Sequence, residues 1–146
     1  VIYRCRRYDL QGKSILKTQE KFYLADSSLK YCIMGFNPKS VAAMLENIVY
    51  FELRRRGYEV YVWKNETKEI DLVAVRREER IYVQACRRLP EEADREGANL
   101  LEIREVGNLK AIRDHYPKYV VTLDQLAAGN INSVKIVHLA DFLLSD

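Results

Sequence analysis

The chain has few of the residues that mark several large protein classes. Its 146 residues include three cysteines, three prolines, six glycines, two histidines and one tryptophan. The cysteines are odd in number and widely spaced, so they predict reduced thiols rather than disulfides, and no two have zinc-ligand spacing. No apolar run is long enough to span a membrane, and no secretory signal opens the sequence. We therefore expect a cytoplasmic protein without a membrane partner.

What the sequence does contain is typical of one folded domain. Hydrophobic residues make up 48% and charged residues 31%, which provides enough apolar surface for a core and argues against disorder. A length of 146 residues fits a single domain. The net charge is +3 and the pI is about 8.7. This mild basic bias permits nucleic-acid binding without requiring it.

The first part of the chain reads as a basic hairpin. Residues 2–8 and 14–24 alternate as strands do, and Gln11-Gly12-Lys13 supplies a turn between them. The chain enters the first strand directly from Val1, which predicts a segment of a longer polypeptide, and the alternative is that a tag or the initiator residue was removed. The hairpin is either the wing of a winged helix or an edge hairpin whose charges prevent association between sheets. Its basic residues are Arg4, Arg6, Arg7, Lys13, Lys17 and Lys21.

Two helices are expected after the hairpin. A cap at Asp26 or Ser27 predicts a short helix that extends to about residue 34. Asn37 and Pro38 then form a strong helix start, with asparagine as the cap and proline at the first helical position. This second helix should extend to residue 56, because Gly57 can adopt the left-handed conformation that ends a helix.

The rest of the chain alternates between strands and helices. Three strands are expected at residues 59–63, 69–75 and 81–86, followed by a helix at about 94–115. Two strands at 119–123 and 134–138 and a short helix up to 144 come next, and a loop with Gly129-Asn130 joins these two strands. Gly107 weakens the middle of the long helix and can split it. Core candidates on that helix are Leu100, Leu101, Ile103, Leu109 and Ile112. A strand that follows a helix pairs in parallel by a right-handed crossover, so we expect an α/β fold with a mixed sheet flanked by helices.

Three polar residues stand in or beside apolar segments. Asp71 lies within IDLVAV, a strand of the kind that is buried on both faces. Gln84 lies in the next strand, and Glu46 borders the apolar stripe of the helix at residues 37–56. Burying a carboxylate costs several kcal/mol unless it is paired, protonated or bound to a metal. Glu52 lies nearer the centre of that stripe, so either helix acid is a candidate for the buried one.

An acid on a helix, an acid on a strand and a polar residue on the next strand have the arrangement of a magnesium site. Mg²⁺ takes oxygen ligands, usually one or two carboxylates with waters and a phosphate. It could activate water and offset charge on a phosphodiester. The plainer interpretation is that Asp71 is held by hydrogen bonds while Glu46 and Glu52 reach solvent or pair with the arginines at 54–56.

The same residues resemble the PD-(D/E)XK nuclease superfamily, in which a helix glutamate and a strand aspartate precede a (D/E)-x-K element on the next strand. Glu46, Asp71 in EIDLVA and Gln84 in YVQAC stand at those places. The resemblance implies a restriction-endonuclease-like core of helix, three strands, helix and strand, preceded here by the hairpin. It also implies that Glu46, Asp71 and Gln84 form the catalytic set, with Glu46 and Asp71 as ligands of Mg²⁺.

Over nearly its whole length the chain is similar to the C-terminal domain of bacterial and archaeal AAA-type ATPases called domain of unknown function 4143. The similar segments are YDLQGKSILKTQEKFYLADSSL, LENIVYFELRRRGYEVYVWK, EIDLVA, IYVQAC, GNLKAIRDHYPKYVVTLD and FLL. The resemblance implies an ATPase domain in the same polypeptide, with residues 1–36 as a remnant of a preceding winged-helix or ATPase region and residues 37–146 as the nuclease-like domain. No G-x-x-x-x-G-K-[ST] motif occurs here, so ATP should not bind to this segment.

The sequence departs from the nuclease pattern at two positions. Gln84 offers a neutral oxygen in place of a carboxylate, and Cys86 replaces the lysine that would stabilise developing negative charge. We therefore expect a non-catalytic accessory domain that binds nucleic acid or a protein partner. The alternatives are an active Mg²⁺-dependent nuclease with a relocated lysine, and a purely structural or dimerising domain. Lys110 and Lys118 are the candidates for a relocated lysine, and Arg87, Arg88 and Lys110 are the candidates for nucleic-acid contacts.

Overall fold

The computed structural model describes residues 1–10, 12–64, 67–89 and 104–145. The expected core residues Leu100, Leu101 and Ile103 therefore lie outside the described part. The elements in chain order are β1 Ile2–Asp9, β2 Ser14–Leu24, α1 Ser27–Met34, a 3₁₀ turn Pro38–Ser40, α2 Val41–Arg55, β3 Glu59–Lys64, β4 Glu69–Arg76, β5 Glu79–Cys86, α4 Arg104–Lys110, β6 Lys118–Thr122, β7 Gly129–Ile131, β8 Val134–His138 and α5 Leu139–Leu144.

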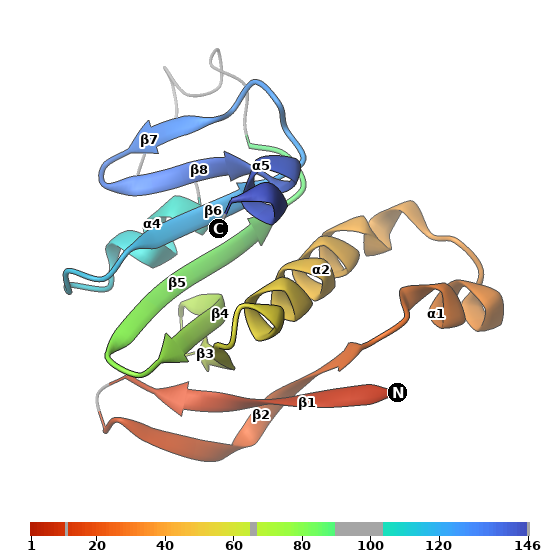
Figure 1. Ribbon diagram of the computed structural model, residues 1–146, viewed down its shortest axis with the longest axis horizontal. Coiled ribbons are helices and arrows are strands. Elements are labelled where there is room, and N and C mark those ends of the chain that lie inside the picture. The colour runs from red at the N-terminus through yellow and green to blue at the C-terminus, as the bar shows by residue number, and fades with distance from the viewer. Residues whose placement is uncertain (11, 65–66, 90–103, 146) are drawn as a thin grey trace.

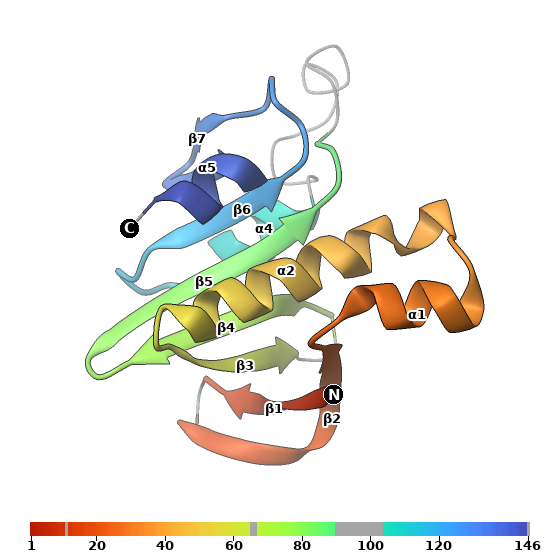
Figure 2. The same ribbon diagram turned by 45° about the vertical axis from the view of Figure 1, so that its right-hand side comes forward.

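The described strands form one mixed sheet in the order β2-β1-β3-β4-β5-β6-β8-β7. The hairpin pairs are antiparallel, whereas β5–β6 and β6–β8 are parallel, as the strand that returns after a helix predicts. Helices α2 and α5 cover one face and α4 covers the other (Figures 1 and 2). The expectation of an α/β fold with a mixed sheet flanked by helices is confirmed.

The helix α2 begins and ends as its flanking residues predict. The Asn37 side chain accepts a hydrogen bond from the Lys39 amide at 2.9 Å, and Pro38 takes the first position of the 3₁₀ turn. At the other end Gly57 has a φ of +83°, and the Tyr58 amide donates to the Leu53 carbonyl at 3.1 Å. This closure satisfies a carbonyl that the helix itself leaves unpaired.

Each face of the sheet has its own hydrophobic core. On the α2 side Leu45, Val49 and Leu53 pack against strand residues such as Leu72 and Val83, all at most 1% exposed. On the α4 side the buried residues include Ile70, Val73, Tyr82, Val106, Leu109 and Val120. A sheet covered on both faces explains why β4 is apolar along almost its whole length.

The N-terminal hairpin belongs to this sheet and forms its edge. β1 lies parallel to β3, with Arg7 opposite Val62, and β2 is the outermost strand. The sheet therefore includes strands from both sides of the boundary expected at residues 36 and 37, and residues 2–24 form a hairpin at its edge. The Asn47 side chain also ties the hairpin to α2, because it accepts from the Leu24 amide at 2.9 Å and donates to the Leu24 carbonyl at 2.8 Å.

Replacing Asn47 by alanine should loosen the hairpin. Both polar backbone atoms of Leu24 lose their partner, so we expect the free energy of unfolding to fall by about 1–3 kcal/mol. Urea unfolding measures the change, with Asn130→Ala on the exposed face of β7 as the matched control. A loss no larger than that of the control would show that the hairpin is held by other contacts.

Two secondary-structure expectations were wrong. The described helix α4 ends at Lys110 instead of residue 115, and Gly107 lies within it without splitting it. Pro117 disfavours a helical conformation at the residue before it, and the Asp114 side chain accepts from the Tyr116 amide to form a turn. Residues 129–131 were expected to be loop but form β7, which pairs with β8 around a two-residue turn.

Helix α1 is short and lies on the outside of the molecule. None of its eight residues is buried, and Ile33 and Met34 are each 76% exposed, followed by Phe36 at 68%. Among the described residues, no helix has the length and apolar character needed to cross a membrane. We call Leu29, Ile33, Met34 and Phe36 the α1 face.

Candidate functional site

The structure brings Glu46 and Asp71 together on the α2 side of the sheet, where the hairpin edge meets the core, and Gln84 reaches the backbone amide of Asp71 from the neighbouring strand. Glu46 comes from the middle of α2, Asp71 from the start of β4 and Gln84 from β5. Lys21 of β2 joins them, with its ammonium group 3.1 Å from Glu46 Oε1 and 3.3 Å from Asp71 Oδ1. Glu46 and Asp71 therefore lie in one polar cluster, and that cluster contains a lysine that no motif pointed to.

A bulge in β4 directs Asp71 toward α2. Tyr61 pairs with Val73 and Trp63 pairs with Ile70, so two residues of β4 stand opposite one residue of β3. Such a bulge re-aims a side chain that would otherwise face the opposite side of the sheet. Asp71 can therefore meet Glu46, although regular alternation along β4 would have separated them.

Gln84 supports this bulge. Its Oε1 accepts a hydrogen bond from the Asp71 amide at 3.1 Å, and its side chain is 5% exposed. In turn Asp71 Oδ2 accepts from the Ala85 amide at 3.0 Å. The pairing of β4 with β5 begins only at Leu72, so Gln84 fills a gap in the ladder. Its oxygen is already engaged by the backbone.

Cys86 points away from this cluster. It is 8% exposed, lies in the core on the α4 side and donates to the Arg88 carbonyl at 3.0 Å. A neutral thiol in that place supplies no positive charge. Lys21, which lies in β2, supplies a positive charge beside Glu46 and Asp71.

Lys21 lies at the centre of three carboxylates. Besides Glu46 and Asp71, Glu69 contacts it, with Oε1 at 2.9 Å from the ammonium nitrogen. Tyr23 completes the group, since its hydroxyl donates to Glu46 Oε1 at 2.5 Å. We call Lys21, Glu46, Glu69 and Asp71 the lysine-centred cluster.

The electrostatics of the cluster follow from this crowding. Burial by itself would lower the pKa of Lys21, but Glu46, Asp71 and Glu69 outweigh burial and raise it above its usual value. Burial, and then the nearby charge of Glu46, raise the pKa of Asp71 to about 6 despite the attraction of Lys21. Burial and the same carboxylate also raise the pKa of Tyr23. Lys21 therefore stays charged at neutral pH, and its positive charge is shared among three acids.

The raised pKa of Asp71 predicts a dependence of stability on pH. An acid whose folded pKa is about 6, against 3.8 normally, binds its proton more tightly when folded, so its contribution to stability rises as the pH falls from 6 to 4. Glu69, whose pKa is lowered, contributes stability that is lost only at lower pH. Between pH 7 and 4.5 we expect the free energy of unfolding to rise by about 2 kcal/mol relative to Asp71→Asn.

Urea unfolding at three pH values measures this difference, because the variant shares every other titrating group with the wild type. If the free energies of unfolding of the wild type and of Asp71→Asn change by the same amount between pH 7 and 4.5, Asp71 keeps an ordinary pKa in the folded domain.

The cluster as arranged does not fit Mg²⁺. A cation between Glu46 and Asp71 would meet the ammonium of Lys21, and the Gln84 oxygen is held by the Asp71 amide. In the part of the chain that the structure describes, no group of three or more His, Cys, Asp or Glu residues is placed to hold a metal ion. Lys21 occupies the place that a cation would need.

The other candidates from the sequence lie elsewhere. Glu52 is buried, but Arg55 and Arg56 contact it at 2.8 and 2.7 Å, so its pairing with helix arginines was the correct interpretation. Lys118 binds Asp114 at 3.0 Å, and Lys110 lies on α4 across the sheet from Glu46. Both lysines therefore lie away from the cluster of Glu46 and Asp71. Arg87 and Arg88 have exposed side chains just after β5.

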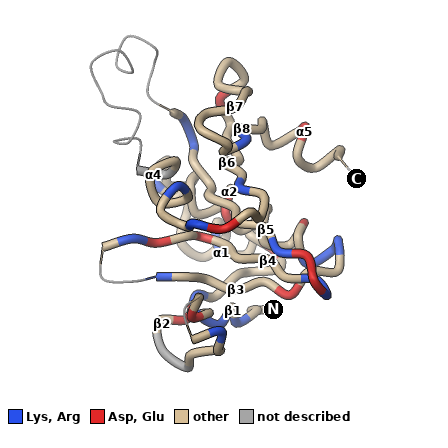
Figure 3. Tube along the Cα trace, turned by 90° about the vertical axis from the view of Figure 1, so that its left-hand side faces the viewer, with Lys and Arg blue, Asp and Glu red and all other residues tan. Residues whose placement is uncertain are grey.

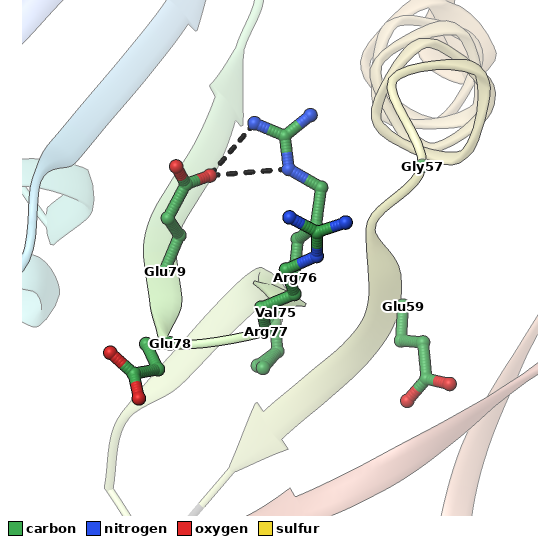
Figure 4. A pocket seen from close by; sticks show the side chains of 7 residues that line it. All are labelled: Gly57, Glu59, Val75, Arg76, Arg77, Glu78 and Glu79. Atoms are coloured by element: carbon green, nitrogen blue, oxygen red, sulfur yellow. Dashed lines mark hydrogen bonds and ion pairs between the residues drawn. The ribbon is translucent and has the colours of Figure 1, made fainter.

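A hollow of about 1070 Å³ lies at the opposite end of β4 from Asp71 (Figure 4). Arg76 is one of the residues that line it, and the Arg76 guanidinium already has hydrogen-bond partners. It donates to Glu79 at 2.8 Å and to the Arg56 carbonyl at 2.8 Å, and it lies over the Tyr58 ring. This hollow lies at the outer end of the β4–β5 hairpin, where Arg76 and Glu79 form an ion pair, so its size does not make it the functional site.

Comparisons with known proteins give one informative match. An uncharacterized protein of Haemophilus influenzae (strain ATCC 51907 / DSM 11121 / KW20 / Rd) is 35% identical to this chain over 144 residues. The match covers 99% of this chain. It covers only 34% of that protein, so the chain spans about one third of the relative's length. No family model and no solved structure matches the chain.

Proposed function

We propose that this chain is a non-catalytic, nuclease-like accessory domain of a AAA-type ATPase and that it binds nucleic acid. The observation that carries the non-catalytic part is the position of Lys21, whose ammonium lies 2.9–3.3 Å from Glu46, Glu69 and Asp71. A side chain that neutralises the acids of a nuclease-like site removes the reason for a metal to bind there. The neutral side chain of Gln84 and the buried thiol of Cys86 also support a non-catalytic domain.

Two observations support a place within a larger protein. The matched relative is about three times as long as the aligned segment. The α1 face, moreover, presents apolar side chains on a helix of eight residues that buries none of them. A helix this short is marginal in water, so a contact with the rest of the polypeptide would stabilise it. The ordered segments shared with ATPase C-terminal domains make an ATPase the proposed neighbour.

Exposed arginines support nucleic acid as the ligand. The chain carries 24 basic and 21 acidic residues. Figure 3 shows basic and acidic residues intermixed along the tube, so no single sign of charge covers the whole molecule. Arg87 and Arg113 nevertheless lie exposed after β5 and α4 respectively. Contacts of this kind to phosphates bind without reading sequence, and they weaken with salt.

The test is a pair of assays on the isolated chain. We expect no Mg²⁺- or Mn²⁺-dependent cleavage of DNA or RNA, and binding of a labelled oligonucleotide that weakens steeply as salt is raised from 50 to about 200 mM. Asp71→Ala should lower stability without changing that binding, because Asp71 belongs to the cluster and not to the basic surface. Metal-dependent cleavage that Asp71→Ala abolishes would rule out the non-catalytic function.

One observation favours the second candidate, an active nuclease. Lys21 is a lysine beside the two acids of the pattern, as a relocated lysine would be. For a nuclease, Lys21→Ala should abolish cleavage while leaving metal binding to the acids. For the non-catalytic domain there is no cleavage to abolish, and the same variant should gain metal binding.

A further inference from the structure

A smaller pocket lies on the α4 side of the sheet, away from the lysine-centred cluster. Its volume is about 300 Å³, the size of a pocket for one small ring system rather than for a peptide. It is formed by side chains of β3 and β5, the segment that follows α4 and the end of the hairpin. The residues that matter below are Leu10, Trp63, Arg80, Tyr82, Ile112 and Arg113.

One part of the pocket lining is apolar. Trp63 is the only tryptophan of the chain and lies half-buried in this part, with Leu10 and Ile112 also partly buried. A half-buried indole beside aliphatic side chains offers a stacking surface for a planar ring. Nucleobases stack on such side chains whatever their identity, because every base has a π face.

The polar part of the lining is supplied by the guanidinium groups of Arg80 and Arg113. Arg80 lies over the rings of Tyr8 and Tyr116, at 5.4 and 5.2 Å from their centroids. In the part of the chain that the structure describes, its terminal nitrogens donate to the hydroxyls of Tyr82 and Tyr8, each at 3.4 Å. Within the described residues its buried Nε has no hydrogen-bond partner, a feature it shares with Arg7. The two contacts of the terminal nitrogens are long, so these nitrogens can still donate to a ligand oxygen or ring nitrogen.

Asp114, also at the pocket, does not oppose an anionic ligand. Its carboxylate accepts from the Tyr82 hydroxyl at 2.5 Å and from Lys118 at 3.0 Å. The bonds to Tyr82 and Lys118, after the opposing effect of burial, lower the pKa of Asp114, so it is ionised and neutralised by its partners. Arg113 beside it is exposed at the rim. The rim therefore carries a positive charge next to the stacking surface.

From these contacts we propose that the pocket binds one unstacked nucleobase together with its phosphate. The base stacks on Trp63, an oxygen or nitrogen of the base accepts from Arg80, and Arg113 contacts the phosphate. The base comes from a single strand or from a free nucleotide, which share this chemistry. The inference rests on the proposed binding of nucleic acid, and it names the position at which a base is held.

Because Trp63 is the sole tryptophan, its fluorescence reports directly on the pocket. We expect a saturable quench on titration with a thymidine dodecamer. Trp63→Ala should weaken binding of the labelled dodecamer, measured by anisotropy, by about tenfold, and Trp63→Phe should restore most of it. Arg113→Ala should weaken binding several-fold, whereas Arg77→Ala, at the exposed turn between β4 and β5, should change it little.

The outcomes separate this inference from the function on which it rests. A quench by thymidine monophosphate as well as by the dodecamer supports the pocket with a free nucleotide as its source. Binding of the dodecamer with unchanged Trp63 fluorescence and an unaffected Arg113→Ala variant overturns the pocket and leaves nucleic-acid binding standing. Absence of binding to either probe overturns both. Arg113 is exposed, so its variant remains informative if Trp63→Ala does not fold.

Discussion

Replacing Lys21 by methionine is expected to destabilise the domain by about 2–3 kcal/mol at pH 7. Methionine keeps most of the aliphatic length but leaves Glu46, Glu69 and Asp71 without their shared cation. Removing one partner of a buried ion pair costs more, but the Lys21 side chain is 30% exposed, and solvent screens part of the loss. Urea unfolding measures the change.

The same variant should acquire affinity for divalent cations. Three carboxylates that converge on one point repel one another once the ammonium is gone, and Mn²⁺ or Mg²⁺ relieves that repulsion with oxygen ligands. We expect saturable Mn²⁺ binding by calorimetry in Lys21→Met, with recovery of stability in millimolar Mn²⁺. Lys39→Ala, at an exposed lysine beside the start of α2, is the control and should show neither effect. Equal Mn²⁺ binding by wild type and variant would contradict the role given to Lys21.

Restoring the carboxylate of the nuclease pattern should be costly. In Gln84→Glu the new side chain can still accept from the Asp71 amide, but it places another negative charge at a position that is 5% exposed. We expect a loss of about 3 kcal/mol or more at pH 7, because an unpaired buried charge is poorly solvated. The loss should shrink toward pH 5, since the added acid will take up a proton.

Gln84→Met separates the charge from the hydrogen bond. It leaves the Asp71 amide without an acceptor, so it should cost about 1–3 kcal/mol with little added dependence on pH. If Gln84→Glu is as stable as the wild type at pH 7, position 84 tolerates a charge and a metal could bind there. In that case the glutamine would not support a non-catalytic site.

The fold was largely predictable because its signals are local. Asn37 and Pro38 start α2 and Gly57 ends it, and these residues act through their own backbone preferences. The apolar run around Asp71 predicted a central strand for the same reason. The residues from 111 to 117 were harder, because the helical pattern continues there while the Asp114 turn and Pro117 end the helix.

The edge strand β7 was missed because its signal lies in the turn after it. Asn132 and Ser133 both have positive φ, at 51° and 69°, which is the geometry of a two-residue hairpin turn. The glycine at 129 was instead read as part of a loop.

The acids of the candidate site were predictable, but its cation was not. Glu46 and Asp71 stood out as polar groups in apolar segments. Lys21 is one of six basic residues in the hairpin, and sequence alternation does not distinguish it from the others. Only the pairing of β1 with β3 and the bulge in β4 bring it to Asp71. Glu69 was missed similarly, because a charge at the start of a strand usually faces solvent.

The most direct test is a crystal of the wild-type chain soaked in Mn²⁺ and measured at a wavelength where manganese scatters anomalously. The non-catalytic account predicts Lys21 between Glu46, Glu69 and Asp71, with no manganese peak among them. A peak within about 2.0–2.6 Å of Glu46 and Asp71 oxygens, with Lys21 displaced, would contradict it and make the domain a metal-binding nuclease candidate.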